Sequence, residues 1–248
     1  MSSLEDRGDE GAGSNAGNSS SLEAENAKLK AEIAFLQKKI QVVGSVTRHD
    51  VLNQLTAVVG YNELLGMMVE DEKQKSFLSK ERQAVDKTRR LFQFAKEYQN
   101  IATEPPLWQS VNKTVHRVME EFDTGIRITV LTGDLVILAD PLLDKVFLQI
   151  FDNTVRHGGK ATEIRISLLD EGSRALLVIE DDGYGIPAAD KEKIFDRGYG
   201  KGTGWGLFLA REILFVTGIT IVENGEPGNG ARFVLQLPAG TYRPGNGK

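Results

Sequence analysis

The chain has 248 residues, of which 40% are hydrophobic, and a formal net charge of −5. This length accommodates one or two domains with a sizeable core, and the negative charge argues against a general nucleic-acid binder, which normally carries a basic footprint. The absence of cysteine excludes disulfides, thiol catalysis and cysteine-ligated metals. No apolar run approaches the roughly 20 residues that a bilayer requires, and the N-terminus lacks the pattern of a secretory signal. We therefore expect a soluble, cytoplasmic protein without a membrane segment.

The N-terminal region divides into a polar tail and a heptad repeat. Residues 1–20 are rich in Gly, Ser, Asn and acidic residues, and this composition predicts a disordered tail because too little apolar surface can be buried. Over residues 21–44, one heptad position carries Leu22, Leu29, Leu36 and Val43, and the other carries Asn26, Ile33 and Ile40. Isoleucine at a, leucine at d and one asparagine at a favour a parallel two-stranded coiled coil. The alternative is a single amphipathic helix that packs on a globular body.

Two further helical patterns occupy residues 45–104. In the first, the apolar residues that share one face are Val51, Leu52, Leu55, Val58, Val59, Leu65 and Met68. The opposite face carries one side chain per turn, namely His49, Asn53, Thr56 and Gly60. After a polar break, the inner face of the second helix carries Leu78, Val85, Thr88, Phe92, Ala95 and Tyr98. Two such helices cannot bury their apolar stripes alone, so we expect a four-helix bundle formed across a dimer.

The pattern changes after Pro105 and Pro106, since consecutive prolines cannot continue a helix. Short strands are predicted where apolar residues alternate or run together, at residues 126–130, 134–140, 164–168, 175–180 and 233–237. Helical patterns lie at roughly residues 110–122, 141–157 and 205–217. This mixture predicts a two-layer α/β domain over residues 105–240, with the helices on one face of a sheet. Residues 241–248 are expected to be a flexible C-terminus.

Three patches of this domain combine polar side chains or glycines in a way that suits a nucleotide. Residues 147–159 (FLQIFDNTVRHGG) predict a helix with several polar side chains within about two turns. Residues 179–187 (IEDDGYGIP) end a strand with acidic residues and two glycines, and residues 193–213 form a glycine-rich loop that opens into a helix. Glycines let backbone N–H groups approach a phosphate, and a helix N-terminus adds positive potential. Each patch alone is commonly a turn, a loop or an exposed helix face, so the indication comes from their order and spacing.

Five segments, in chain order, resemble the motif boxes of sensor histidine kinases: RHDVLNQL, FLQIFDNTVRHGG, DDGYGI, KIFDRGYG and GTGWGLFLA. The resemblance covers about residues 45–238, and it is strongest to the sensor kinases of methanogenic archaea. It implies a dimerisation and phosphoacceptor bundle over residues 45–104, followed by an ATP-binding domain of the GHKL type over residues 105–240. It also implies ATP and Mg²⁺ as cofactors, a homodimer, and the receiver domain of a response regulator as the partner.

The resemblance assigns three roles in the bundle. His49 is expected to be the phosphoacceptor, and Asp50 is expected to orient and polarise its imidazole. Asn53, one helical turn further on, matches the residue that positions water for dephosphorylating the regulator. The chemistry suits these residue types, because phosphoryl transfer needs an in-line nucleophile with electrostatic stabilisation, and an imidazole with its ordinary pKa is largely unprotonated near neutral pH.

The resemblance also assigns roles in the ATP-binding domain. Asn153 is expected to bind magnesium, Arg156 and His157 to contact the phosphates and ribose, and Asp181 to accept a hydrogen bond from the adenine amino group. The residues expected to shape the pocket and its loop are Gly183, Gly185, Lys201, Gly202, Thr203, Gly204 and Gly206. Gln149 occupies a position where many of these kinases have asparagine, so its phosphate or metal geometry differs from theirs.

Two other departures and two alternative functions accompany this prediction. Gln54 stands where many families have a proline after the phosphohistidine, and the segment NGARFVLQL lacks the hydroxyl side chain often found beside the adenine. Gln149 raises the alternative of a kinase-impaired relative that acts mainly as a regulator phosphatase. A nucleotide-switched dimeric adaptor is the alternative from another class, but the histidine-bearing bundle argues against it.

Overall fold

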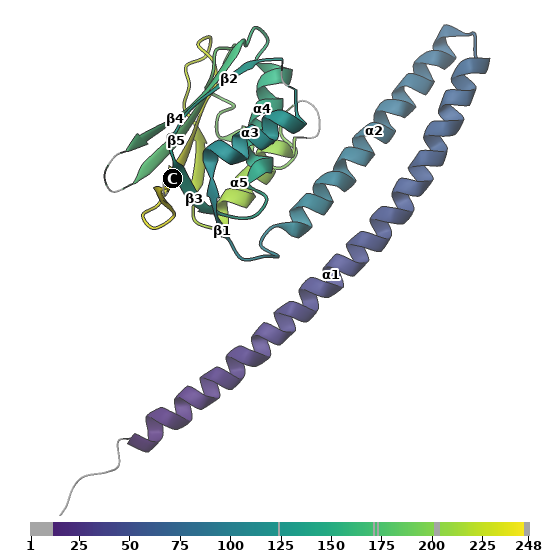
Figure 1. Ribbon diagram of the computed structural model, residues 1–248. Helices are drawn as coiled ribbons and strands as arrows, with labels where there is room; N and C mark the ends of the chain where they lie inside the picture. The colour runs from purple at the N-terminus through teal and green to yellow at the C-terminus, as the bar shows by residue number, and fades with distance from the viewer. Residues whose placement is uncertain (1–11, 124, 171, 173, 201–203, 246–248) are drawn as a thin grey trace, which may run out of the picture. The chain divides into compact units, whose positions relative to one another are not determined.

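The computed structural model describes residues 12–123, 125–170, 172, 174–200 and 204–245 (Figure 1). The chain divides into two units, Met1–Asn53 and Gln54–Lys248, and the division falls within helix α1 (Ala12–Met68). The second unit contains the rest of α1, helix α2 (Glu72–Asn100) and an α/β domain. Among the described residues, no helix combines the length and the apolarity that crossing a membrane requires.

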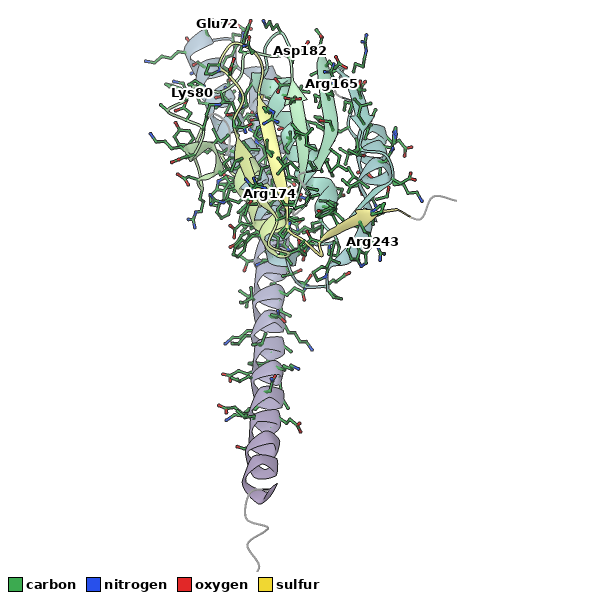
Figure 2. All side chains as sticks on the ribbon, turned by 90° about the vertical axis from the view of Figure 1, so that its left-hand side faces the viewer. Glu72, Lys80, Arg165, Arg174, Asp182 and Arg243 are labelled. Atoms are coloured by element: carbon green, nitrogen blue, oxygen red, sulfur yellow. The ribbon has the colours of Figure 1, made fainter. Side chains whose placement is uncertain are left out.

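Helix α1 begins earlier than the sequence predicts. The tail was expected to reach residue 20, but residues 12–20 are helical, and residues 1–11 lie outside the described part of the chain. The physical reason is that adding residues to an existing helix costs far less than starting one, so a helix can extend into a polar segment that would not fold alone. From residue 21 to residue 43 every side chain is exposed, including the heptad leucines and isoleucines (Figure 2).

The second part of α1 pairs with α2 as an antiparallel hairpin. The Asp71 carboxylate caps α2 by accepting from the Gln74 N–H at 2.9 Å, and an N-cap of this kind satisfies a helix N–H that has no partner within the helix. Across the hairpin, Arg82 pairs with Glu63 at 2.8 Å. The Asn62 amide donates to the Leu78 carbonyl at 3.0 Å. These bonds set the register of the two helices.

The polar stripe predicted for α1 agrees with the structure, and the apolar stripe agrees only in part. The polar stripe is exposed as predicted, and Val58 and Val59 on the apolar stripe are half-buried. Leu65 and Met68 were expected to be buried but are 48% and 79% exposed, because one hairpin offers a single partner helix. Asn62 is buried instead. The hydrophobic periodicity could not indicate this, because an amide side chain counts as polar and is expected on the surface.

In the described residues, the α/β domain contains three α-helices and two sheets. The helices are α3 (Val111–Glu121), α4 (Leu143–His157) and α5 (Gly206–Phe215), and a short 3-10 turn, η1, spans Lys193–Phe195. The smaller sheet, in the order β1-β3-β8, is antiparallel and consists of β1 (Leu107–Ser110), β3 (Leu135–Ala139) and β8 (Tyr242–Pro244). The larger sheet, in the order β2-β4-β5-β7-β6, consists of β2 (Arg127–Leu131), β4 (Glu163–Asp170), β5 (Ala175–Asp181), β7 (Arg232–Leu237) and β6 (Thr220–Glu223). Figure 1 shows the three helices on one side of this larger sheet.

The predicted α/β fold with helices on one sheet face is confirmed. The three predicted helices agree with α3, α4 and α5 to within two residues at each end. The second sheet was not anticipated, because β1 and β8 have only four and three residues, too few to show alternation. The flexible C-terminus expected from residue 241 is corrected accordingly, since Tyr242 pairs with Ile137 of β3 and the domain extends to Pro244.

A single hydrophobic core connects the helices with both sheets and fixes the orientation of α4. The buried face of α4 carries Val146, Phe147, Ile150 and Phe151, which are at most 1% exposed. The strands contribute alternate residues such as Ile164, Ile166, Leu177, Ile179, Phe233 and Leu235. Because one face of α4 is anchored in this core, the polar residues of the opposite face are held outward, toward the cleft described below.

A buried carboxylate ties the connector between α2 and β1 to the start of α4. Asp140 is 1% exposed, and its two oxygens accept from the N–H groups of Leu142 at 2.9 Å and Ala102 at 2.8 Å. Ala102 has a φ of 56°, a left-handed conformation that is strained for a residue with a side chain. The Gln109 amide donates to the Asp140 carbonyl at 2.8 Å and completes the network.

Replacing Asp140 with alanine is expected to lower the free energy of unfolding by about 2–4 kcal/mol, because two backbone N–H groups lose a charged acceptor. Urea denaturation followed by circular dichroism measures this loss. Asp134→Ala is the matched control: Asp134 is exposed in the turn before β3, and we expect a change within about 0.5 kcal/mol. Equal losses in the two variants would contradict the role of Asp140.

Candidate functional site

His49 lies on the exposed polar stripe of α1 with two predicted partners beside it. Its Nδ1 is 3.1 Å from Asp50 Oδ1, and the two side chains are 74% and 70% exposed. Asn53 lies one turn further on, with Nδ2 at 3.4 Å from each ring nitrogen, which is too long for a strong hydrogen bond. With its proton on Nδ1 donated to Asp50, the imidazole carries a lone pair on Nε2, and the Asn53 amide lies 3.4 Å from this atom.

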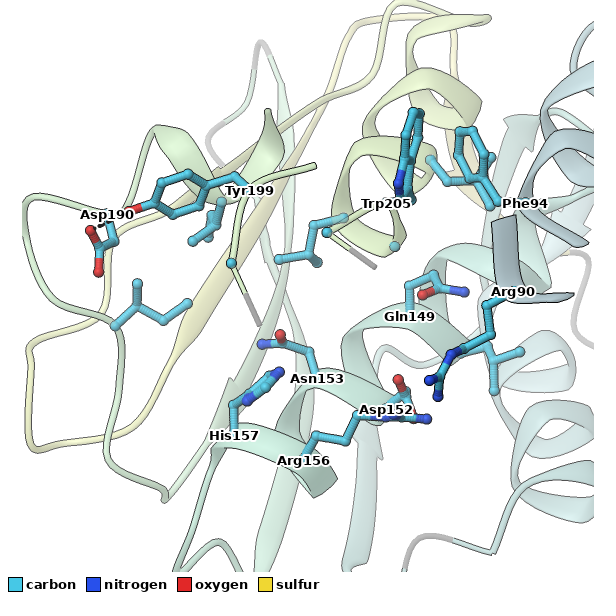
Figure 3. A pocket seen from close by; sticks show the side chains of 18 of the residues that line it. Arg90, Phe94, Gln149, Asp152, Asn153, Arg156, His157, Asp190, Tyr199 and Trp205 are labelled. Carbon is cyan, nitrogen blue, oxygen red and sulfur yellow. Dashed lines mark hydrogen bonds and ion pairs between the residues drawn. The ribbon is translucent and has the colours of Figure 1, made fainter. Parts of the chain in front are cut away.

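A cleft of about 670 Å³ lies in the second unit, a volume typical of small-molecule sites. Helix α4 contributes five of the polar side chains that line it, Gln149, Asp152, Asn153, Arg156 and His157 (Figure 3). Other walls come from the segment after β5, from Tyr199 and Gly200, and from the start of α5. On the side of α2, Phe94 lines the cleft, with its ring centroid 4.3 Å from that of Trp205.

The five polar residues of α4 in the cleft differ in their hydrogen bonds. Arg156 Nε donates to Asp152 Oδ1 at 2.6 Å, an i,i+4 ion pair that holds the guanidinium at the cleft edge. Asn153 and His157 point into the cleft and make no side-chain hydrogen bond with the other described residues. Their donors and acceptors are therefore available to a ligand.

Gln149 extends toward the first residue of α5. A Cβ added to Gly206 would lie 2.2 Å from Gln149 Oε1, so the amide occupies space that only a glycine leaves free. The longer side chain, noted in the sequence as a departure from the family pattern, thus reaches across the cleft floor to the N-terminus of a helix. We expect Gly206 to tolerate no larger residue while Gln149 keeps this position.

Asp181, the last residue of β5, is fixed by three hydrogen bonds. Its Oδ1 accepts from the N–H groups of Gly183 at 2.9 Å and Ala231 at 3.0 Å. Its Oδ2 accepts from the Thr154 hydroxyl at 2.8 Å. Thr154 contacts this predicted site residue but was not itself predicted, because its side chain lies on the buried face of α4. It supplies a hydroxyl beside Asp181, although the segment NGARFVLQL contains none.

The neighbouring Asp182 makes a separate set of hydrogen bonds, to the start of β4 and the residue before it. It accepts from the Thr162 hydroxyl and the Thr162 N–H, both at 2.6 Å, and from the Glu163 N–H at 3.0 Å. These hydrogen bonds, the hydroxyl first, lower the pKa of Asp182 to about 2. Its contribution to stability is present above the ordinary carboxyl range and is lost as the pH falls toward 2. Asp182 therefore holds the start of β4, and neither Asp181 nor Asp182 is among the residues that line the cleft.

Of the predicted pocket glycines that the structure describes, Gly185, Gly204 and Gly206 line the cleft and Gly183 does not. Gly185 lines it with a φ of +70°, and a Cβ there would meet the Gly230 carbonyl at 2.7 Å. Gly183 packs against the backbone of Gly158, while Gly204 and Gly206 line the cleft where the loop leads into α5. The other predicted loop residues, Lys201, Gly202 and Thr203, lie outside the described residues.

Several apolar and aromatic residues of the cleft were not predicted. They are Ile186, Pro187, Ile194, Tyr199, Trp205, Leu207 and Leu209. Each lies within or directly beside a glycine motif, so the motif boundaries were the signal that could have identified them. They give the cleft the mixed lining, apolar walls with a few polar groups, that is typical of ligand sites.

Within the described ranges, no cluster of three or more His, Cys, Asp or Glu side chains could hold a metal ion. Magnesium bound with a nucleotide does not require one, because it keeps waters and takes ligands from the phosphates. The free amide oxygen of Asn153 is a hard ligand of the type that this ion prefers. The residues present therefore fit a nucleotide-borne Mg²⁺.

Comparison with known protein families identifies the class of the α/β domain. Residues 139–241 match the family described as histidine kinase-, DNA gyrase B-, and HSP90-like ATPase. The matched range begins at the end of β3 and includes α4, Asp181, the glycine loop and α5. The domain is therefore an ATP-binding domain of the GHKL type.

Two relatives with similar sequences are both named sensor proteins. The chain is 28% identical over 232 residues to the sensor protein SrrB of Staphylococcus aureus (strain MRSA252). This alignment covers 82% of this chain and 38% of that protein. The chain is 35% identical over 101 residues to the alginate biosynthesis sensor protein KinB of Pseudomonas aeruginosa. This alignment covers 39% of this chain and 17% of that protein. The chain thus spans less than two fifths of the length of these relatives. The predicted likeness to archaeal kinases stays a prediction.

Solved structures share the fold. Full-length ShkA in complex with AMPPNP superposes with a TM-score of 0.57 at 22% identity, over 79% of this chain and 45% of that chain. The Acinetobacter baumannii histidine kinase AdeS gives a TM-score of 0.54 at 17% identity, over 77% of this chain and 98% of that chain. Both likenesses extend beyond the ATP-binding domain and include the helical region.

Proposed function

We propose that the chain acts as an ATP-dependent protein-histidine kinase. It transfers the γ-phosphoryl group of ATP to His49 and then to an aspartate in the receiver domain of a response regulator. The observation that carries this proposal is an exposed imidazole whose Nδ1 is engaged by Asp50 and whose Nε2 lies 3.4 Å from the Asn53 amide. The same chain contains the cleft of a GHKL-type domain. The predicted cytoplasmic location remains part of this proposal.

Two ends of the nucleotide are recognised by different residues. Asp181 accepts a hydrogen bond from the exocyclic amino group of adenine, because its carboxylate is held in place by Thr154 and two backbone N–H groups. The phosphates lie toward Asn153 and the N-terminus of α5, where backbone N–H groups favour anions. Asn153 would hold Mg²⁺, which when bound neutralises charge on the phosphate oxygens.

The transfer step follows from the geometry of His49. The Nε2 lone pair attacks the γ-phosphorus in line, and the N–P bond forms as the bond to the β,γ-bridging oxygen breaks and ADP leaves with that electron pair. Asp50 retains the hydrogen bond from Nδ1 and offsets the positive charge that develops on the ring. His49 and the cleft belong to different units, so the ATP that is used is bound either to the same chain or to a second copy.

The exposed heptad positions support a homodimer. Leu22, Leu29, Ile33 and Ile40 are between 52% and 63% exposed in the single chain. In a parallel pair, these residues would pack into one seam, and Asn26 at an a position would favour two strands in register. The same pairing would cover Leu65 in a four-helix bundle.

Labelled ATP with Mg²⁺ tests the proposal. We expect acid-labile, base-stable labelling of the chain, followed by loss of that label when a cognate receiver domain is added. The kinase-impaired alternative, which Gln149 suggests, predicts no labelling but accelerated decay of a phosphorylated receiver. A nucleotide-switched adaptor would bind ATP without producing either phosphorylated species.

Asn53→Ala is expected to separate the two activities. Asn53 emerges from the same helix face as His49, so a receiver docked to accept phosphate would hold its phospho-aspartate near this amide. The amide can orient a water for in-line attack without being a nucleophile. Autophosphorylation and forward transfer should be nearly unchanged, while dephosphorylation slows by about 10²-fold, as for the loss of a positioning group.

The measurement is the decay of a preloaded phospho-receiver after kinase and ADP are added. Thr56→Ala, one turn beyond Asn53 on the same exposed stripe, is the matched control and should show the parental decay rate. Parental decay with Asn53→Ala as well would show that Asn53 does not position the water.

A further inference from the structure

Tyr199 links two walls of the cleft through its hydroxyl group. Its ring lines the cleft, and its hydroxyl donates to Asp190 Oδ1 at 2.6 Å (Figure 3). Asp190 also lines the cleft but belongs to the segment that follows β5. The hydrogen bond to this carboxylate raises the pKa of Tyr199 above its ordinary value, so the hydroxyl stays protonated and remains a donor at neutral pH.

The backbone around Tyr199 is also constrained. The Tyr199 N–H donates to the Asp196 carbonyl at 3.2 Å. The Gly198 N–H donates to the Gly204 carbonyl at 2.9 Å, which joins the two ends of the glycine loop at its base. The tyrosine side chain therefore projects from a defined point, and the bond to Asp190 selects its direction.

The segment that carries Asp190 is also held at the adjacent residue. The next residue, Lys191, donates to the Glu223 carboxylate and to the Gly225 carbonyl. The Glu223 side chain is fully buried, and its other oxygen accepts from the N–H groups of Gly225 at 3.0 Å and Arg232 at 3.1 Å. A buried ion pair with all its partners in place is a rigid attachment. It anchors the segment that carries Asp190 to the β6–β7 hairpin.

We propose that the Tyr199–Asp190 hydrogen bond is a clasp that makes Tyr199 a positioning residue for the nucleotide. The clasp holds the phenol ring as a wall of the cleft, so that the wall is formed before the nucleotide binds. Binding then costs less, because the Tyr199 side chain is already ordered. This inference rests on the proposed function, since it assigns the same cleft to ATP and ADP.

The test is a double-mutant cycle on the full chain, with the dissociation constant of Mg²⁺–ADP measured by calorimetry. Tyr199→Phe keeps the ring and removes the donor, and Asp190→Ala removes the acceptor. Each change is expected to weaken binding about three- to tenfold, the range for one hydrogen bond. The double variant should bind no more weakly than either single one, because both remove the same interaction. Asp190→Asn retains an acceptor oxygen and should restore most of the affinity.

The steady-state kinetics of autophosphorylation distinguish a positioning role of Tyr199 from a general loss of activity. In autophosphorylation, Tyr199→Phe should raise the KM for ATP by the same factor and leave the rate at saturating ATP unchanged. Tyr61→Phe is the matched control, since Tyr61 is 69% exposed on α1 outside the ATP-binding domain, and both constants should stay at the parental values.

Three results would overturn the clasp: parental affinity in Tyr199→Phe, fully additive losses in the double variant, or no recovery in Asp190→Asn. A parental chain that binds no Mg²⁺–ADP would instead overturn the proposed function itself. The two failures are therefore distinguishable, because the first set requires a parental protein that binds the nucleotide.

Discussion

His49→Gln is expected to abolish autophosphorylation while changing the affinity for ATP less than about twofold. Glutamine keeps a polar side chain of similar size but has no nucleophilic nitrogen, so the phosphoryl group has no acceptor. Fold and nucleotide binding should be unaffected, because the His49 side chain is 74% exposed and belongs to a different unit from the cleft. Incorporation of label from γ-labelled ATP measures the first effect, and titration with a fluorescent ATP analogue measures the second.

His116→Gln is the matched control for this experiment. His116 is also exposed, but it lies on α3 and does not line the cleft. It should leave labelling at the parental level. Undiminished acid-labile labelling of His49→Gln would show that another residue accepts the phosphoryl group.

Asp181→Asn is expected to weaken ATP binding by about 10- to 100-fold. The carboxylate uses Oδ1 for the N–H groups of Gly183 and Ala231 and Oδ2 for the Thr154 hydroxyl. An amide has only one acceptor oxygen, so its NH₂ group would face either the two N–H groups or the Thr154 hydroxyl, all of which are donors. The substitution also removes the negative charge that strengthens the hydrogen bond to adenine. Hydrogen bonds to charged groups are worth about 1.5–3 kcal/mol, which sets the expected range. The fluorescent-analogue titration measures the affinity directly.

Asp182→Asn provides the adjacent control. Asp182 is exposed and engaged with Thr162 and Glu163 rather than with the cleft. Its substitution should leave ATP affinity within about twofold of the parent, while the dependence of stability on acid pH becomes weaker. Equal affinities for Asp181→Asn and the parent would contradict the adenine role of Asp181.

The elements that the sequence predicted well are those whose burial repeats with a regular period. Helix α4 was recognisable because Phe147, Ile150 and Phe151 recur on one face, and the same face explains why Asn153 and His157 point the other way. Strands β4 and β5 were recognisable from alternation or from a continuous apolar run. A regular spacing of apolar residues indicates which face of a helix or strand is buried. Such an element can therefore be identified without knowing what it packs against.

What the sequence could not show depends on partners that are distant in the chain. Thr154 reaches the predicted site residue Asp181, 27 positions away, only because the fold brings β5 beside α4. Strand β8 has three residues and exists because β3 offers it an edge. Asn62 is buried because α2 presents a carbonyl and a carboxylate to its amide. Asp190 and Tyr199 are nine positions apart, but only the folded loop turns them toward each other.

The central claim is that His49 carries the phosphoryl group. The most direct measurement is mass spectrometry of the protein after incubation with ATP and Mg²⁺, with fragmentation under neutral or basic conditions that preserve an acid-labile phosphate. We expect one phosphate on the peptide that contains His49, located on the imidazole and lost on brief acid treatment. Phosphate on a serine, a threonine or another histidine, with His49 unmodified, would contradict the assignment.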